Sequence, residues 1–183
     1  NNVGPRARAP ISNVHDAYDK LASADGIGTI VDQAIETGIA PRRETLTKAY
    51  SYLLKVNNFG RIEELAEKTS TTPRFDDEVV DATVRNLVGS EGRHTPASVQ
   101  LRDSLEPFVK FANLIHQAGS TIADEHVERA CQIYLESYVA GEEDRGLEGR
   151  IGVVDRLYDK LGINPSEAIT ALKLERRIKE LEI

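Results

Sequence analysis

The stretch GIAPRRETLTKAYSYLLKVNNFGRIEELAEK, residues 38–68, decides the fold of this chain. Its pattern predicts a turn, a helix, a short connection and a second helix. Gly38 suits the left-handed conformation that ends a helix, and Pro41 cannot continue one. Asn57 and Asn58 are typical turn residues and interrupt the helical periodicity. The apolar positions are Leu46, Ala49, Tyr50, Leu53 and Leu54 in the first helix and Ile62, Leu65 and Ala66 in the second.

The pattern of the first helix, Leu46-x-x-Ala49-x4-Leu54, returns elsewhere in the chain. It recurs as Val79-x-x-Ala82-x4-Leu87, as Val127-x-x-Ala130-x4-Leu135 and, upstream, as Val14-x-x-Ala17-x4-Ala22. The second helix repeats as well, because Gly28-x-Ile30-x3-Ala34 matches Gly60-x-Ile62-x3-Ala66 with an offset of 32 residues, from 28 to 60. An αα-hairpin cannot bury both of its faces alone. Matches in the same order at a near-constant period therefore predict stacked copies.

We predict an all-α chain, folded as a right-handed α-solenoid of about four antiparallel helix pairs plus a C-terminal helix. Besides the central pair, helices are expected over residues 13–23, 27–37, 76–88, 98–117, 124–138, 148–161 and from 165 to the end. Pro107 lies inside the helix expected at 98–117 and should kink or split it. Residues 1–12 are expected to form an extended arm, and residues 13–183 a single helical-repeat domain.

Two features of the predicted helices bear on packing. Ala49, Ala82 and Ala130 occupy matching places in their repeats, where two helices are expected to approach closely. In the last helix, Leu174, Ile178 and Leu181 form an apolar stripe at i, i+4 and i+7.

Composition limits the classes of function. The 183 residues are 40% hydrophobic, and no apolar run approaches the roughly 18 residues that a membrane-spanning helix needs. The formal net charge of −7 argues against nonspecific binding of nucleic acid, although it leaves room for a local basic patch. Cys131 is the single cysteine, so no internal disulfide can form. The chain does not begin with Met, which fits either the removal of an organellar presequence or a cloned fragment.

The motifs of common catalytic and cofactor sites are missing from the sequence. Gly26-Ile27-Gly28 is too short for a dinucleotide-binding loop and is better explained as a corner between helices. His126 and Cys131 share a predicted helix, but a metal site needs more ligands than these two. We therefore interpret Cys131 as a small core residue and His126 as a surface or capping residue. No catalytic residue, metal site or cofactor is expected, and the chain is predicted not to be an enzyme.

The central hairpin resembles a pentatricopeptide repeat, a relative of the tetratricopeptide repeat. The resemblance rests on the Gly38-Ile39-Ala40-Pro41 turn, on Leu46 and Ala49, and on the corner from Asn58 to Ile62. Proteins of that family usually bind RNA through polar side chains on the first helix of each repeat, and Thr47 would suit that role. The matching positions in the other repeats are Val80, His15 and Glu128, and the turn positions are Arg42, Arg74 and Ser166 in place of the usual Asn or Asp.

Residues 41–68 are also similar to part of the cytochrome c oxidase subunit Va family, on the basis of the Asn57-Asn58-Phe59 corner. That family consists of noncatalytic helical subunits on the matrix side of a mitochondrial enzyme. Both resemblances imply a mitochondrial location.

Two hypotheses for the function follow from these observations. The first is a noncatalytic scaffold or accessory subunit of a larger, mitochondrial assembly such as a respiratory complex, whose partners are protein subunits. The second is an organellar RNA-binding or ribosome-associated repeat protein. The residues expected to contact a partner are Arg42, Arg43, Thr47, Arg61 and Arg74, with the arginines on phosphates and Thr47 on a base if the partner is RNA.

Overall fold

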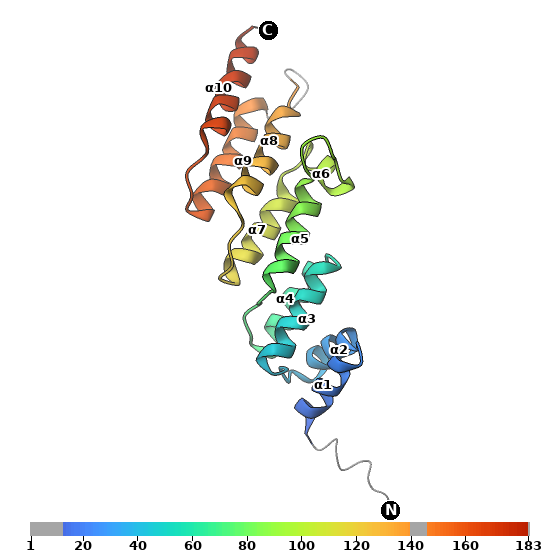
Figure 1. Ribbon diagram of the computed structural model, residues 1–183. Helices are drawn as coiled ribbons and strands as arrows, with labels where there is room; N and C mark the ends of the chain where they lie inside the picture. The colour runs from blue at the N-terminus through green and yellow to red at the C-terminus, as the bar shows by residue number, and fades with distance from the viewer. Residues whose placement is uncertain (1–12, 140–145, 183) are drawn as a thin grey trace, which may run out of the picture. The chain divides into compact units, whose positions relative to one another are not determined.

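The computed structural model describes residues 13–139 and 146–182, and within these ranges the chain forms ten helices and no strand (Figure 1). The prediction of an all-α chain is therefore confirmed. The expected N-terminal arm lies outside the described residues. The chain divides into two compact units, Asn1–Val80 and Asp81–Ile183. A single repeat domain over residues 13–183 stays a prediction.

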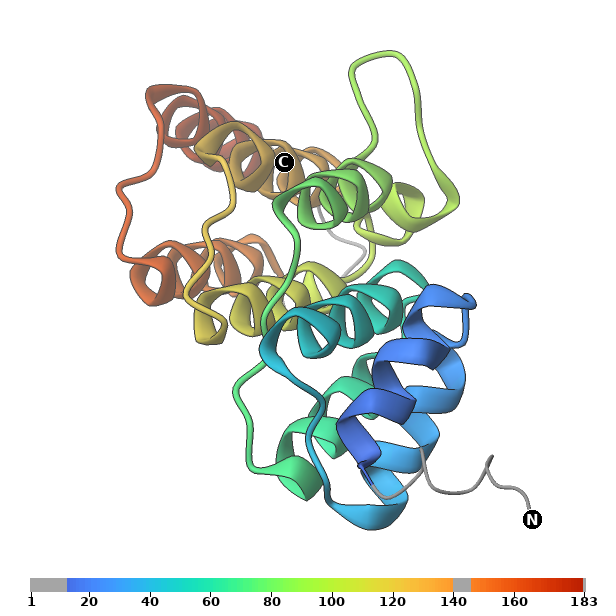
Figure 2. The same cartoon turned by 60° about the horizontal axis from the view of Figure 1, so that its bottom comes forward.

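Unit 1 contains two helix pairs. Its helices are α1 (Val14–Ser23), α2 (Ile27–Thr37), α3 (Arg43–Lys55), α4 (Phe59–Thr69) and the first turn of α5 (Asp77–Val88). Within each pair the chain folds back on itself, so that α1 lies beside α2 and α3 beside α4 (Figure 2). The two pairs stack with their corresponding helices in contact: the first helices, α1 and α3, contact each other, and so do the second helices, α2 and α4. Helix α2 also contacts α3.

The helix ends in unit 1 follow the expected local chemistry. Gly38 ends α2 with a φ of 75°, and its N–H donates to the carbonyl of Ala34 at 2.8 Å. Asn57 adopts a φ of 57°, in the left-handed region that Asn tolerates better than most residues. The side chain of Asn58 then caps α4 by accepting from the N–H of Arg61 at 3.3 Å. The predicted turn between α3 and α4 is confirmed.

The core of unit 1 is built around Tyr50, which is fully buried. Its ring packs edge-on against Phe75 at a centroid distance of 6.2 Å. Its hydroxyl pairs with Oγ1 of Thr71 at 2.6 Å, so the polar end of this buried side chain has a partner. The interpretation of Tyr50 as a core residue is confirmed, whereas Tyr52 is 42% exposed. Ala49, Leu54, Ile62 and Leu65 are also fully buried.

Unit 2 contains the rest of α5 and five further helices. These are α6 (Pro96–Gln100), α7 (Glu106–Gln117), α8 (Asp124–Glu136), α9 (Gly146–Leu161) and α10 (Glu167–Leu181). Pro107 splits the helix that was expected at 98–117, because it lies in the first turn of α7, where its missing N–H costs nothing. As in unit 1, like helices contact each other, α7 with α9 and α8 with α10, and α9 also contacts α8 and α10.

The buried face of α8 has the same spacing as that of α3. Val127, Ala130, Cys131, Tyr134 and Leu135 are buried, as are Leu46, Ala49, Tyr50, Leu53 and Leu54. Ala130 is fully buried, as its alignment with Ala49 predicts. The two helices therefore present equivalent faces to their respective cores.

The predicted alignment of α5 is wrong by one position. Ala82, which was matched to Ala49, is exposed, while Thr83 is buried. Val80, Val84, Leu87 and Val88 are buried on the same face. The spacing between the equivalent positions, from Ala49 to Thr83, is thus 34 residues and not 33. Adjacent Val79 and Val80 made both registers compatible with an apolar pattern.

The apolar stripe of α10 is present but does not face the core. Leu174, Ile178 and Leu181 are 54%, 59% and 87% exposed, respectively. The opposite side of the helix is anchored by Ile169, which is fully buried, and by the ion pair of Lys173 with Asp155 at 2.8 Å. The stripe therefore lies on the outward face of a helix that is already packed on α8 and α9.

Candidate functional site

Two of the five predicted contact residues lie together on the outer face of α3. Arg43 and Thr47 line a shallow surface cavity of about 470 Å³, together with Glu44, Lys48 and Asp76. The hydroxyl of Thr47 donates to the carbonyl of Arg43 at 3.0 Å, so its hydrogen is already engaged. Neither Arg43 nor Lys48 forms an ion pair with any residue that the structure describes. This face of α3 therefore offers two cations without an ion-pair partner and a hydroxyl acceptor, beside the carboxylates of Glu44 and Asp76.

Arg42 is paired with acids of α1. Its guanidinium contacts Asp19 and lies 3.6 Å from Oδ1 of Asp16. Asp19 also accepts from the hydroxyl of Thr45 at 3.3 Å. These contacts link α1 to the start of α3, so Arg42 has a structural role in unit 1. A phosphate or an acidic partner would have to displace a carboxylate to bind Arg42.

Arg61 makes the equivalent link between α2 and α4. Its guanidinium contacts Asp32 on α2 and pairs with Glu64 on its own helix at 3.1 Å. Arg74 is half-buried in the connection before α5 and does not line the cavity on α3. The structure therefore places Arg43 and Thr47 together and directs Arg42 and Arg61 into separate ion pairs.

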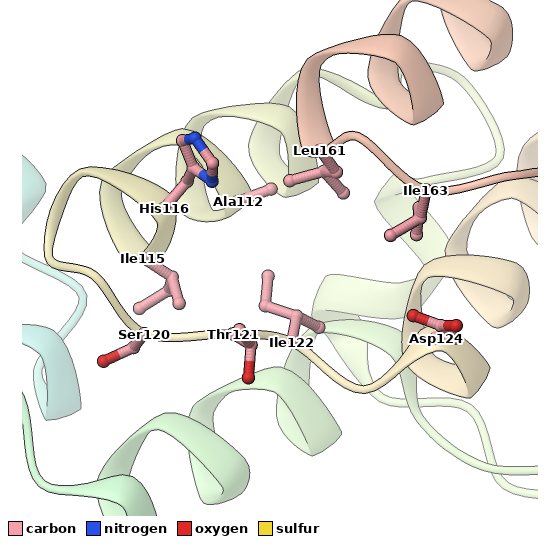
Figure 3. Close-up of a pocket in the computed structure, with 9 residues that line it drawn as sticks. All are labelled: Ala112, Ile115, His116, Ser120, Thr121, Ile122, Asp124, Leu161 and Ile163. Atoms are coloured by element: carbon pink, nitrogen blue, oxygen red, sulfur yellow. The ribbon is translucent and has the colours of Figure 1, made fainter.

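Unit 2 contains a small apolar cavity that no sequence pattern indicated. It has a volume of about 120 Å³ and lies among the end of α7, the connection to α8 and the segment after α9 (Figure 3). Ile122, Leu161 and Ile163 converge on it, whereas the hydroxyls of Ser120 and Thr121 point away. A cavity near 150 Å³ with apolar walls can stay dry and accept a small apolar molecule. This one has room for an aliphatic group, with His116 and Asp124 at its edge.

The buried titratable groups of unit 2 are poor candidates for catalysis. Burial raises the pKa of Cys131 to about 12, so the thiol stays protonated at neutral pH and is a weak nucleophile. Burial likewise raises the pKa of Tyr158. The interpretation of Cys131 as a core residue is confirmed by its complete burial. His126 is half-buried, and its Nε2 lies 3.7 Å from Oδ1 of Asp81.

Within residues 13–139 and 146–182, no group of three or more His, Cys, Asp or Glu side chains is placed to hold a metal ion. In the same residues, no helix combines the length and the apolar character that crossing a bilayer requires.

Comparisons with family models, curated proteins and solved structures give no match to this chain. Its own residues and packing are therefore the basis for assigning it to a class of protein.

Proposed function

We propose that this chain is a noncatalytic α-solenoid scaffold, and that it serves as an accessory subunit of a larger assembly. The support is the packing repeated in both units, where first helices contact first helices and second helices contact second helices. Such stacking is the basis of solenoid architectures, and their extended faces bind protein partners. A right-handed superhelix running through both units is part of this proposal.

The observation that carries the proposal is the bare apolar stripe of α10, formed by Leu174, Ile178 and Leu181. In the described chain, α1, α3 and α8 are each followed by a second helix that packs on them: α2, α4 and α9. Helix α10 packs on α8 and α9 as a further first helix would, with its stripe more than half exposed. The occupant that we propose for this stripe is an amphipathic helix of a partner protein, whose own apolar face would cover the three side chains.

In its most specific form, the proposal places the chain in mitochondria and makes the assembly a respiratory complex. Both assignments rest on the resemblance of residues 38–68 to pentatricopeptide repeats and of residues 41–68 to cytochrome c oxidase subunit Va.

Native mass analysis of the endogenous protein tests the scaffold proposal. We expect a stable complex with other protein chains, and a lone monomer would overturn the proposal. The complex should dissociate in Ile178→Glu, because burying an unpaired carboxylate in the partner interface is costly. Lys179→Gln is the matched control on the same helix turn, where the wild-type side chain makes only a long pair with Glu175 at 3.8 Å. If both variants retain the complex, the partner does not bind at the stripe.

A second candidate is an RNA-binding repeat protein, favoured by Arg43 and Lys48, which lie beside Thr47 on α3 and form no ion pair with a described residue. Phosphate contacts predict binding of single-stranded RNA that weakens steeply between low and moderate salt. Lys48→Gln should reduce that binding, whereas Lys55→Gln, on the same helix but outside the cavity, should not. Absence of RNA binding at low salt would eliminate this candidate and leave the scaffold proposal intact.

A further inference from the structure

A third surface cavity, in unit 2, gathers two arginines and a histidine from three segments of the chain. It has a volume of about 420 Å³. His94 comes from the loop between α5 and α6, Arg102 from the turn after α6, and Arg129 from the middle of α8. The remaining lining residues are Ile133, Glu136 and Ser137, at the end of α8. The volume lies within the range of about 300–1,000 Å³ that is typical of small-molecule sites.

The guanidinium of Arg129 is fixed by a hydrogen bond but has no ion-pair partner among the described residues. Its Nη2 donates to the carbonyl of Ser90 at 3.0 Å, while its Nε is buried without a hydrogen-bond partner. Neither Arg129 nor Arg102 forms an ion pair with a residue in the described part of the chain. Partial burial of an unpaired cation costs free energy, which a bound anion would offset.

The backbone carbonyl of Arg102 is held by a hydrogen bond from the buried side chain of Arg150. The Arg150 side chain is only 5% exposed, and its Nη1 donates to the carbonyls of Arg102 at 2.7 Å and Tyr134 at 2.6 Å. It also donates to Oγ of Ser137 at 3.0 Å, and its guanidinium lies 4.4 Å from the centre of the Tyr134 ring. This cluster ties the turn after α6 to the end of α8.

The loop that carries His94 is also held by several hydrogen bonds. Ser90 and Arg93 exchange two backbone hydrogen bonds of 2.9 Å each, and this closes a tight turn. The hydroxyl of Thr95 donates to the carbonyl of Asn86 at 2.6 Å and caps α6 by accepting from the N–H of Ser98. The arginines and the histidine of the cavity are thus presented by fixed segments, which lowers the cost of ordering them around a ligand.

We propose that this cavity binds the phosphate group of a small phosphorylated ligand. Donors approach from three segments, and a phosphate has three strong acceptor oxygens where a carboxylate has two. Glu136 is the one acid in the lining, and its charge works against the anion and limits the affinity. The site shares no residue with the stripe on α10, and the proposal does not depend on the scaffold function.

Titration of the full-length protein with inorganic phosphate, at ionic strength held constant with chloride, tests this site. We expect saturable binding that shifts the backbone amide resonances of Ser90 and Ser137. Arg102→Gln and Arg129→Gln should each weaken binding about tenfold or more, because each removes a charge-assisted hydrogen bond. Glu136→Gln should tighten binding. Arg156→Gln, an exposed arginine on α9 outside the cavity, is the matched control and should bind as the wild type does.

Three outcomes would overturn the proposal. One is the absence of saturable binding by the wild type. Another is unchanged binding in Arg102→Gln, a variant of an exposed residue whose folding can be verified by its thermal midpoint. The third is acetate binding as tightly as phosphate under the same conditions, which would make the site one for carboxylates.

Discussion

At the scale of single residues, Ala49 is a position of unit 1 with no room for a larger side chain. It is fully buried in α3, which contacts α1, α2 and α4 at once. Interiors are packed closely enough that an added side chain must displace its neighbours. Ala82 has the same side chain in α5 but is exposed. The same substitution at the two alanines changes helix propensity equally, but it changes core packing only at Ala49. Comparing the two variants therefore isolates the effect of packing on stability.

Ala49→Leu should lower stability by about 1–3 kcal/mol, since overpacking forces shifts of the surrounding helices. Ala82→Leu should change stability by no more than about 0.5 kcal/mol, because the new side chain extends into solvent. Thermal unfolding monitored by circular dichroism measures both effects, with Lys55→Gln as an exposed control on α3. Equal loss in the two leucine variants would mean that Ala82 is the true equivalent of Ala49 and that Thr83 is not.

At the scale of helices, the ends are set by a few residues with special backbone requirements. Gly38 ends α2 in the left-handed region, and a Cβ there would also lie 3.3 Å from the carbonyl of Lys68. Gly60, in the first turn of α4, has helical geometry, and a Cβ added there would meet no atom within 4 Å. The same substitution at these two positions should therefore have opposite effects.

Gly38→Ala should destabilise the protein by about 1–2 kcal/mol, because a residue with a Cβ is strained in the left-handed region. Gly60→Ala should stabilise it by about 0.4–1 kcal/mol, because alanine restricts the unfolded chain and fits the helix. Urea unfolding of both variants beside the wild type checks this difference in sign. Destabilisation in Gly60→Ala would show that the first turn of α4 has no room for a methyl group.

Helices bounded by glycine, proline or asparagine could be predicted from the sequence. Which face of each helix packs against the core was harder to predict. The bounds of α2 agree with the prediction because Gly26 and Gly38 bracket a clear apolar pattern. The outward stripe of α10 has the same spacing as a core stripe, so periodicity alone cannot assign it to the core or to a partner. The ion pairs of Arg42 with Asp19 and of Arg61 with Asp32 were missed because these acids lie on other helices. The cavities of unit 2 combine separate segments that only the fold brings together.

At the scale of the whole molecule, we propose that the chain is a repeat protein whose helix pairs depend on their immediate neighbours. Each unit is consistent with this claim, because its like helices stack in the same way. In a one-dimensional array, damage to one repeat propagates to adjacent repeats and fades beyond them. A single globular bundle would instead lose stability as one cooperative unit.

Amide hydrogen exchange of Ala49→Leu, compared with the wild type, tests this claim most directly. We predict faster exchange concentrated in α1 to α5, residues 14–88, with the amides of α8, α9 and α10 retaining most of their protection. A uniform loss of protection across every helix, up to α10, would contradict the repeat architecture.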